Sequence, residues 1–379
     1  MEDRVDPAPL TPIRLALALP SLAQDGGAER VMLTLIRRLD RRYFAPILIV
    51  VDQGSADVAD MVPADVPVYD LGVSRVRFAV LPLIRLLYRL RPQALLTGLG
   101  HLNLMVALIA RSLPPGLVLI GRETSVVSEM NRELGLTALR NLAYRNFYPR
   151  LDRVICQSQD MLDDLTKVLR FPSDRAVLIH NPVDLETTRT RAMQKLDSAD
   201  LFWSNDCSLK LVAVGRLAPQ KGFDLLISAL AMLPTTTFEL LIIGQGELHD
   251  ELLSQIHSLQ LQGRVRLLGY QENPYVFMAQ ADAVVLSSRY EGLPNVVLEA
   301  LACGTPVLAT PAPGGLREIS IIAGGILLAD GISAIDLANV IRRFDLDRSA
   351  AGAPDMSAFG VDRIVPRYQD LIIETVRDG

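Results

Sequence analysis

Short apolar segments alternate with helical segments along the whole chain of 379 residues, and this alternation limits the possible folds more than any other feature. Strands that are separated by helices form parallel sheets covered by helices on both faces. The sequence therefore predicts an α/β protein with two Rossmann-like, doubly wound domains. The predicted strands are residues 14–19, 46–51, 94–97, 117–120 and 154–157 in the first half, and 209–214, 239–244, 265–268, 283–286 and 307–310 in the second.

Residues 185–208 are polar and lack strand periodicity, so the domain boundary is placed after Asp184. We expect an N-terminal domain over residues 1–184, a C-terminal domain over 185–360, and a closing segment, 361–379, that forms an amphipathic helix. Ligands of open parallel sheets bind at the carboxyl ends of the strands. The active site is therefore expected in a cleft between two facing domains.

Composition excludes several classes of protein. The net charge of −5 and the isoelectric point near 5.5 argue against nucleic acid as a partner. The cysteines Cys156, Cys207 and Cys303 form neither a disulfide framework nor a zinc pattern, which fits a reducing cytoplasm. Residues 1–12 lack the features of a secretory signal, and no apolar stretch reaches the roughly 18 residues needed to span a bilayer. We expect a cytoplasmic protein that is soluble or peripheral to the membrane.

The sequence YEGLPNVVLEA, residues 290–300, places a Gly-Leu-Pro-Asn turn before a predicted helix. Pro294 is expected at the first helical position of a helix over residues 294–303. Free amides around Leu293, Asn295 and Val296 would then face an anion, which the helix dipole also favours. This turn is therefore a candidate phosphate site.

Two glutamates flank this turn. Glu299 lies on the same helical face as Asn295, and beside a diphosphate it would accept hydrogen bonds from neutral hydroxyls such as a ribose diol. Glu291, in the loop before the helix, would reach the other end of a bound nucleotide. In the functional interpretation, one of these carboxylates binds each sugar of a bound nucleotide sugar. In the alternative, the helix is an ordinary capped surface helix and both glutamates are solvated.

The surrounding strings resemble one known family. They are GRLAPQKG (215–222), IIGQGE (242–247), LLGYQENPYVFMAQADAVVLSSRYEGLPNVVLEALACGTPVLAT (267–310) and GGLREI (314–319). In this order they resemble retaining glycosyltransferases of the GT-B fold, glycosyltransferase family four or group 1. Residues 291–310 are most similar to bacterial enzymes of surface polysaccharide or lipid-linked oligosaccharide assembly. In this family the closing helix crosses back to the first domain.

The resemblance implies that Arg216 and Lys221 hold the diphosphate of the donor, where fixed cations replace a metal. No metal and no cofactor are therefore expected. The single Asp-x-Asp sequence, residues 345–347, follows a helical stretch rather than a central strand and is interpreted as chance.

Further donor contacts are expected from loops that follow strands in the second half. In GQGE, residues 244–247, His249 stands where a dinucleotide fingerprint needs its third glycine, so a hydride-transfer enzyme is disfavoured. Glycines here let backbone approach a base and ribose. The resemblance implies that the turn around Tyr270 hydrogen-bonds a uracil. The expected donor-binding residues are Gly27, Gly215, Gly246, Tyr270, Gly292, Leu293, Pro294, Asn295, Val296 and Glu299.

Candidate residues in the first domain also follow strands. Gly26 and Gly27 precede a helix expected near Ala28, and the resemblance places this loop near the donor phosphate and the acceptor; an ordinary flexible turn is the alternative. His101 matches a family histidine that contacts the transferred sugar, although a lone histidine is more often structural. The remaining candidates are Arg122 and Glu123, expected to point at the acceptor, and Asn181, expected to organise the interdomain hinge.

Residues 75–153 contain twelve arginines, no lysine and four acidic residues, which gives a net charge of +8. In VRFAVLPLIRLLYRLRP, residues 76–92, arginines alternate with large apolar residues, as in helices that lie on anionic membranes. An ordinary amphipathic helix packed on its sheet fits the pattern equally well. A membrane-bound enzyme would use a lipid-linked acceptor such as a polyprenyl diphosphate sugar.

The sequence thus predicts a metal-independent, retaining transfer of a hexose or N-acetylhexosamine from a UDP-sugar to a glycan or a polyprenyl-diphosphate-linked acceptor. Three alternatives stay open. A nonhydrolysing UDP-sugar epimerase shares the architecture, a sugar-nucleotide-binding protein could lack catalysis, and a phosphorylase would need a lysine-bound pyridoxal cofactor.

Overall fold

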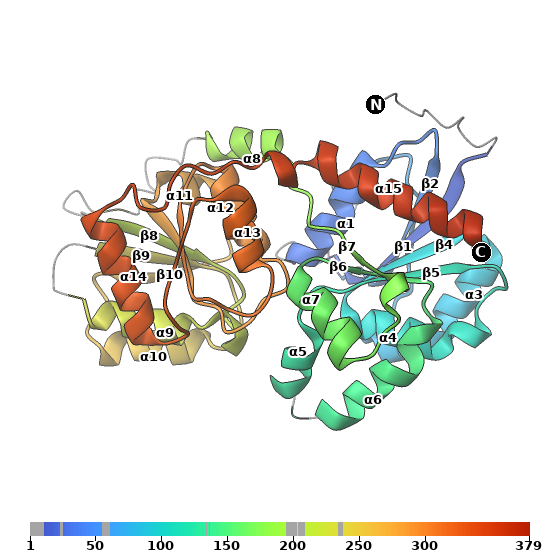
Figure 1. The fold of residues 1–379 in the computed structure, drawn as a ribbon, viewed down its shortest axis with the longest axis horizontal. Helices are drawn as coiled ribbons and strands as arrows, with labels where there is room; N and C mark the ends of the chain where they lie inside the picture. Colours follow the sequence, from blue (N-terminus) through green and yellow to red (C-terminus); the bar gives the residue numbers. More distant parts are fainter. Residues whose placement is uncertain are drawn as a thin grey trace. The chain divides into compact units, whose positions relative to one another are not determined.

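The computed structural model describes residues 11–22, 26–54, 61–133, 135, 137–194, 203, 209–233 and 238–379 (Figure 1). The chain divides into two compact units. The first unit comprises Met1–Pro182 and Asp362–Gly379, and the second comprises Val183–Val361. No helix of the described residues is both long enough and apolar enough to cross a bilayer.

The first unit is built on a seven-stranded parallel sheet with the order β3-β2-β1-β4-β5-β6-β7. Chain order reverses on the two sides of β1, which makes the β1/β4 neighbourhood the switch point where such sheets open for ligands. The strands are β1 (Ile13–Ser21), β2 (Phe44–Asp52), β3 (Val68–Asp70), β4 (Ala94–Gly98), β5 (Val118–Arg122), β6 (Arg153–Cys156) and β7 (Ala176–Leu178).

Helices cover both faces of this sheet. They are α1 (Gly27–Arg38), α3 (Val80–Leu90), α4 (Gly100–Ile109), α5 (Val127–Glu133), α6 (Thr137–Phe147), α7 (Gln159–Asp163) and α15 (Val361–Asp378), with short turns η1 (Val76–Phe78), η2 (Ala110–Ser112), η3 (Tyr148–Arg150), η4 (Asp164–Val168, of π type) and η5 (Ser173–Arg175). A buried cluster that includes Leu87, Val106 and Tyr148 packs between the sheet and helices α3, α4 and α6.

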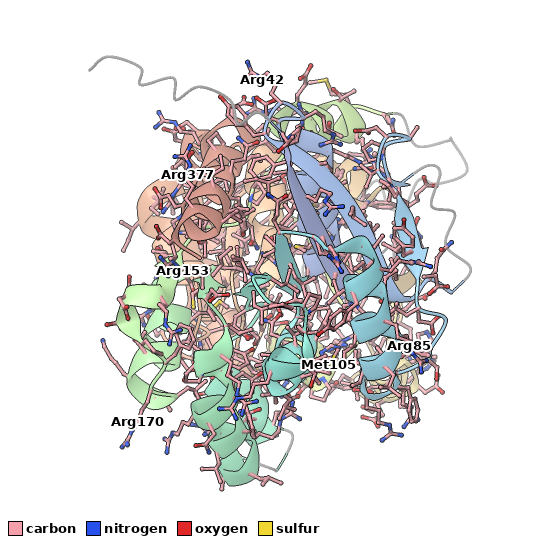
Figure 2. The ribbon with its side chains drawn as sticks, turned by 90° about the vertical axis from the view of Figure 1, so that its right-hand side faces the viewer. Arg42, Arg85, Met105, Arg153, Arg170 and Arg377 are labelled. Carbon is pink, nitrogen blue, oxygen red and sulfur yellow. The ribbon has the colours of Figure 1, made fainter. Side chains whose placement is uncertain are left out.

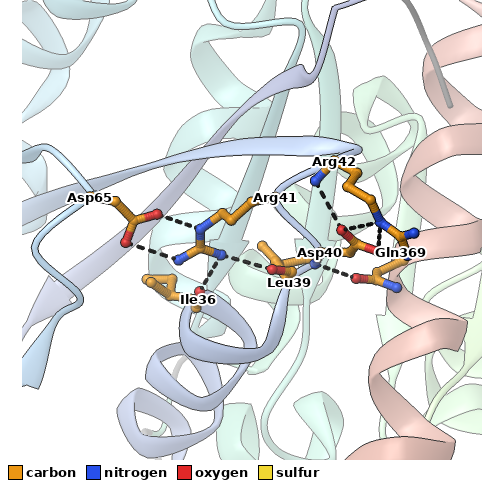
Figure 3. Close-up of polar contacts among 7 residues, drawn as sticks. All are labelled: Ile36, Leu39, Asp40, Arg41, Arg42, Asp65 and Gln369. Carbon is orange, nitrogen blue, oxygen red and sulfur yellow. Dashed lines mark hydrogen bonds and ion pairs between the residues drawn. The ribbon is translucent and has the colours of Figure 1, made fainter.

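The closing helix α15 packs on the first unit (Figure 1). Figure 3 shows one attachment point, where the side chain of Gln369 accepts a hydrogen bond of 2.8 Å from the backbone N–H of Asp40. Beside it, Arg41 donates to carbonyls at the end of α1, those of Ile36 and Leu39, at 2.9 Å each. The Arg41 side chain thus provides hydrogen-bond donors to carbonyls at the end of α1 that would otherwise lack partners.

The second unit is built on a six-stranded parallel sheet with the order β10-β9-β8-β11-β12-β13. One buried cluster packs α9, α10 and α14 on one face, and a second packs α11, α12 and α13 on the other. The strands are β8 (Leu209–Val214), β9 (Phe238–Ile243), β10 (Val265–Gly269), β11 (Ala283–Leu286), β12 (Val307–Ala309) and β13 (Ile326–Leu328). The helices are α8 (Leu185–Ala192), α9 (Phe223–Ala231), α10 (His249–Ser258), α11 (Pro274–Gln280), α12 (Asn295–Ala302), α13 (Leu316–Ala323) and α14 (Ala334–Leu346), with turns η7 (Pro219–Lys221) and η8 (Ser357–Phe359).

The predicted fold class is confirmed, and every predicted strand is present. Three strands were missed, β3, β7 and β13, each of three residues at an edge of its sheet. Helix α8 was also missed, because its sequence LETTRTRA has almost no apolar face. The prediction that Pro294 begins the helix was wrong by one residue. Pro294 has extended backbone angles and is the N-cap, and α12 ends at Ala302.

Candidate active site

The carboxyl edge of the sheet in the second unit carries the loops with the predicted donor residues. Strand β8 leads to Gly215, Arg216 and Lys221, and strand β11 leads to the loop that contains Glu291. Because β8 and β11 are parallel neighbours, these two loops leave the sheet side by side. The sheet therefore brings together Lys221 and Glu291, which are 70 positions apart in the sequence.

Lys221 and Glu291 form an ion pair at the centre of this edge. Lys221 Nζ lies 2.7 Å from Glu291 Oε1, and the side chains are 20% and 7% exposed, respectively. Ser288 Oγ donates a second hydrogen bond, of 2.6 Å, to the same oxygen of Glu291. The carboxylate is thus held by one cation and one hydroxyl, and both of these partners are side chains on loops.

Arg289 and Asp224 clamp the turn that carries Lys221. Their side chains are joined by two hydrogen bonds of 2.9 and 2.7 Å, and Arg289 also donates to the carbonyl of Pro219 at 2.6 Å. Burial alone would raise the pKa of Asp224, but the hydrogen bonds and charge of Arg289 lower it overall. Sequence reasoning did not find this clamp, because neither residue carries a signal until the two loops are brought together.

Arg216 differs from its neighbours. Its side chain is exposed, and within the described part of the chain no hydrogen bond or ion pair holds its guanidinium. A planar guanidinium at the carboxyl edge of the sheet is well suited to donate two hydrogen bonds to the oxygens of a phosphate.

Close packing of loops explains two of the predicted glycines. A Cβ at Gly246 would collide with the carbonyl oxygen of Leu217, and Gly244, with φ of +142°, packs in the same way against Gly215. At Gly215, a Cβ would lie 3.3 Å from the side chain of Lys221. The glycines therefore let the loops after β8 and β9 pack on each other, a reason that the sequence interpretation had not included.

The loop from Glu291 to Pro294 is held at both ends. The N–H of Glu291 donates to the carbonyl of Pro313 at 2.8 Å, and the N–H of Gly315 donates to the carbonyl of Gly292 at 2.6 Å. A Cβ at Gly314 would lie 2.8 Å from the carbonyl oxygen of Gly292, so a side chain there would separate the two loops. Leu293 is buried beneath the turn.

Helix α12 begins directly after this loop. The carbonyl of the N-cap Pro294 accepts from the N–H of Val297 at 3.0 Å, and Asn295 and Val296 form the first turn. Glu299 lies one turn further on, is 8% exposed, and accepts a long hydrogen bond of 3.5 Å from the hydroxyl of Tyr275. Burial, together with the charge of Glu299, raises the pKa of Cys303 to about 12. Tyr270, from the loop after β10, is half-buried at the same edge of the sheet.

In the first unit, Gly26 is the N-cap of α1 and Gly27 is its first residue. The carboxylate of Glu29 folds back onto this helix start and occupies the space where a side chain at Gly26 would lie. A negatively charged side chain in the first turn already interacts favourably with the positive end of the helix dipole. A phosphate at this helix start would have to displace the Glu29 carboxylate.

His101 lies on the first turn of α4, directly after β4, where its side chain is partly exposed and partly covered by the protein. Partial burial of the ring, and then the charge of Arg140, lower the pKa of His101 below its usual value. The imidazole is therefore neutral over a wider pH range than that of an ordinary histidine.

Arg122 and Glu123 were expected to point at the acceptor, and the structure buries both side chains within the first unit. Arg122 is completely buried, with Nε donating to Tyr368 Oη at 3.1 Å and Nη2 donating to Asn181 Oδ1 at 2.6 Å. Asn181 thus anchors Arg122. Arg122 is buried because it ends an inner strand and hydrogen-bonds to Tyr368 of α15. A contact of Arg122 or Glu123 with the acceptor stays a prediction.

Glu123 is 2% exposed. Burial raises its pKa, whereas hydrogen bonds from the hydroxyl of Tyr148 and from Asn103 Nδ2, the latter of 3.1 Å, act in the opposite direction. Glu123 therefore contacts side chains of its own unit rather than solvent.

Two family models together match most of the chain. The model described as "Glycosyl transferases group 1" matches residues 204–354, and the model described as "Glycosyltransferase Family 4" matches residues 25–187. An N-acetylgalactosaminyltransferase of Campylobacter jejuni, which acts on N-acetylgalactosamine-N,N'-diacetylbacillosaminyl-diphospho-undecaprenol, is 30% identical over 319 residues, 81% of this chain and 83% of that protein.

Solved structures show the same fold. HepE of Anabaena, in complex with UDP and glucose, matches with a TM-score of 0.75 at 21% identity, over 97% of this chain and all of that one. The sucrose-phosphate synthase of Thermosynechococcus elongatus matches with a TM-score of 0.79 at 19% identity over the same share of each chain.

Two doubly wound units, matched over almost the whole chain by these structures, define the GT-B fold. The chain belongs to the group 1 glycosyl transferases, glycosyltransferase family four. It is an enzyme that transfers a sugar from a nucleotide sugar.

Proposed function

We propose that this enzyme transfers a hexose or N-acetylhexosamine from a UDP-sugar to a polyprenyl-diphosphate-linked sugar or glycan, with retention of anomeric configuration and without a metal. The ion pair between Lys221 and Glu291, beside the exposed Arg216, is the observation that carries the proposal. Two cations and a carboxylate thus gather at the carboxyl edge of one sheet. The choice of donor and acceptor is supported by the UDP complex of HepE and by the diphospho-undecaprenol substrate of the Campylobacter relative.

When the donor binds, the diphosphate takes the place of Glu291 as the counterion of Lys221, and Arg216 contacts the same oxygens. Glu291 is then released to accept hydrogen bonds from hydroxyls of the transferred sugar, while Glu299 accepts from the ribose. The first turn of α12, at Asn295 and Val296, presents N–H groups to the diphosphate. Tyr270 and its turn lie against the base.

Transfer breaks the bond between the anomeric carbon and the leaving phosphate oxygen, and the acceptor oxygen bonds to the same face of the sugar. The leaving phosphate takes the acceptor proton. Arg216 and Lys221 stabilise the charge that builds on the diphosphate, the work that a metal ion performs in other enzymes. His101, whose lowered pKa favours the neutral imidazole, exchanges a hydrogen bond with a hydroxyl of the transferred sugar.

A coupled assay tests this proposal. UDP release from a panel of UDP-, GDP- and ADP-sugars is measured with and without a polyprenyl-diphosphate sugar, in EDTA, and the new linkage is examined by NMR. We expect release only with a UDP-sugar and acceptor, and an unchanged anomeric configuration. Epimerised UDP-sugar without acceptor would indicate the epimerase, and nucleotide binding without any turnover would indicate an inactive binding protein.

We further propose that the first unit docks on the anionic inner face of the cytoplasmic membrane through the outer face of η1 and α3. Leu83, Leu86 and Leu87 face the core, which accounts for the packing of the helix on its sheet. The opposite face exposes apolar side chains and arginines together: Phe78, Leu81 and Tyr88 are 56%, 60% and 47% exposed, and Arg77, Arg85 and Arg89 are exposed beside them. Figure 2 shows Arg85 on the outside of the first unit.

Cosedimentation with vesicles tests the docking surface. The protein should bind vesicles that contain phosphatidylglycerol and not vesicles of phosphatidylcholine alone, and Arg85→Glu should weaken binding more than Lys167→Glu, an equal charge change on the exposed side of η4. Equal binding by both variants would contradict this surface without affecting the proposed chemistry.

A further inference from the structure

A polar cluster in the first unit surrounds the first turn of α4, the turn that carries His101. Three of its members lie four residues apart on one face of α6 and its continuation η3: Arg140, Tyr144 and Tyr148. Glu123, which directly follows β5, completes the cluster. Both α6 and η3 pack against α4.

The cluster approaches the backbone of Gly100 closely. A Cβ at Gly100 would lie 2.8 Å from Glu123 Oε2 and 2.9 Å from Tyr144 Oη, closer than real Cβ atoms are found. The hydroxyl of Tyr148 lies 3.5 Å from the carbonyl oxygen of Gly100 and donates to Glu123 Oε1. A side chain at Gly100 would therefore force Glu123 or Tyr144 to shift, although the backbone of Gly100 is not left-handed.

The turn that these groups contact is bent at Leu99. Leu99 has φ of 81°, which is unfavourable for a residue with a branched side chain and costs about 1–3 kcal/mol. Its carbonyl accepts from the N–H groups of Leu102 and Asn103 at 3.0 and 3.1 Å, so the bend fixes where α4 begins. Such strain persists only where surrounding contacts enforce it.

Asn103 ties this turn to the cluster from the other side. Its Nδ2 donates to Glu123 Oε1 at 3.1 Å and to the carbonyl of Arg122 at 3.0 Å, and its Oδ1 accepts from Thr97 Oγ1 at 2.6 Å. Strand β4, the bend and the first turn of α4 are thus joined to Glu123 through buried hydrogen bonds.

We propose that Glu123, Tyr148 and Tyr144 are positioning residues that hold the strained first turn of α4, and that Arg140 on the same stripe sets the charge environment of His101. This role rests on the proposed function, in which His101 contacts the transferred sugar. The cluster members act through His101 and do not contact substrate themselves.

The first test changes Gly100. Alanine loses less backbone freedom than glycine when a helix forms, so Gly100→Ala, at the first residue of α4, should be neutral or stabilising unless the cluster excludes its methyl group. We expect kcat to fall about ten- to a hundredfold, with UDP affinity unchanged because the nucleotide contacts lie in the second unit. Gly263→Ala, at an open position, is the matched control and should leave both values unchanged. Full activity of Gly100→Ala would overturn the positioning role.

The second test follows His101 directly by NMR titration of its imidazole, assigned with His101→Gln. The groups that face this turn are Arg140 and Tyr144 from α6, Tyr148 from η3 and Glu123 after β5. Arg140→Gln should raise the pKa of His101, Arg140→Lys should keep it low, and Arg145→Gln, further along α6, should not change it. An identical titration in all four proteins would overturn the role of Arg140.

The two tests separate this inference from the proposed function. If the wild-type protein transfers no sugar from any UDP-sugar, the proposed function fails. The role of the cluster is then still decided by the pKa of His101 in the titration and by whether the NMR signal of His101 shifts in Gly100→Ala.

Discussion

Two charged pairs follow strands in the two units, and their surroundings are opposite. In the second unit, Lys221 and Glu291 meet each other across two loops, and Lys221 keeps contact with solvent. In the first unit, Arg122 and Glu123 are consecutive, buried, and hydrogen-bonded to neutral side chains of their own unit. A place at the end of a strand therefore does not by itself make a charged residue a ligand contact.

The difference lies in whether the partners can be exchanged. A diphosphate can replace Glu291 as the counterion of Lys221, because the pair lies on loops and Lys221 is partly exposed. Arg122 would have to break hydrogen bonds with Tyr368 and Asn181 and to leave a cavity before it could contact a ligand. We infer that the pair in the second unit serves catalysis and that the pair in the first unit serves structure.

The largest expected effect is on turnover. Lys221→Ala should lower kcat about a hundred- to a thousandfold, because a fixed cation on the departing diphosphate is lost. Glu291→Ala should also act mainly on kcat. Turnover at saturating donor is the measurement, with Lys167→Ala on the surface as the control. Turnover near wild type for Lys221→Ala would remove this residue from the mechanism.

A pair of arginine variants separates the two units most directly. Arg122→Ala should lower the free energy of unfolding by about 3 kcal/mol, because Asn181 and Tyr368 lose a buried partner. Arg216→Ala should change it by less than about 0.5 kcal/mol, because Arg216 is exposed, yet it should sharply reduce turnover. Urea unfolding and kinetics measure both. The comparison fails if Arg122→Ala is as stable as wild type or if Arg216→Ala is fully active.

A smaller effect is expected at the ribose end of the donor. Glu299→Ala should weaken UDP binding about ten- to a hundredfold, the value of one or two hydrogen bonds to a charged acceptor. Titration calorimetry with UDP measures the loss, and Glu186→Ala, in the first turn of α8, serves as the control. Unchanged affinity would show that Glu299 only packs inside α12.

The smallest effect concerns pH. Burial raises the pKa of Glu123 in the folded protein. Protonated Glu123 therefore contributes fully to the stability of the fold below the ordinary pKa of 4.5, and this contribution is lost as the pH rises through the pKa of the folded protein. Glu123→Gln carries no such proton. Its melting temperature should therefore rise relative to that of wild type as the pH is raised above 4.5, and parallel pH profiles would argue against a raised pKa.

Sequence analysis was most successful where the signal is local. Runs of branched apolar residues marked the long strands, and the turn before α12 marked the loop of Glu291. The clamp of Arg289 on Asp224 and the hydroxyl of Ser288 were missed, since each depends on a contact between separate side chains that the fold brings together. One signal was available but not used, the spacing of four between Arg140, Tyr144 and Tyr148, which places them on one face of a helix.

The two doubly wound units, and the strands that precede the donor residues, could be predicted from the sequence alone, because hydrophobic periodicity and turn chemistry act over a few neighbouring residues. Which charged residues are buried became known only from the folded structure. Arg122 and Tyr368 are 246 positions apart, and no local pattern records their hydrogen bond. Burial and pairing depend on which distant segments the sheets bring together, so they separate the residues that bind from those that hold the fold.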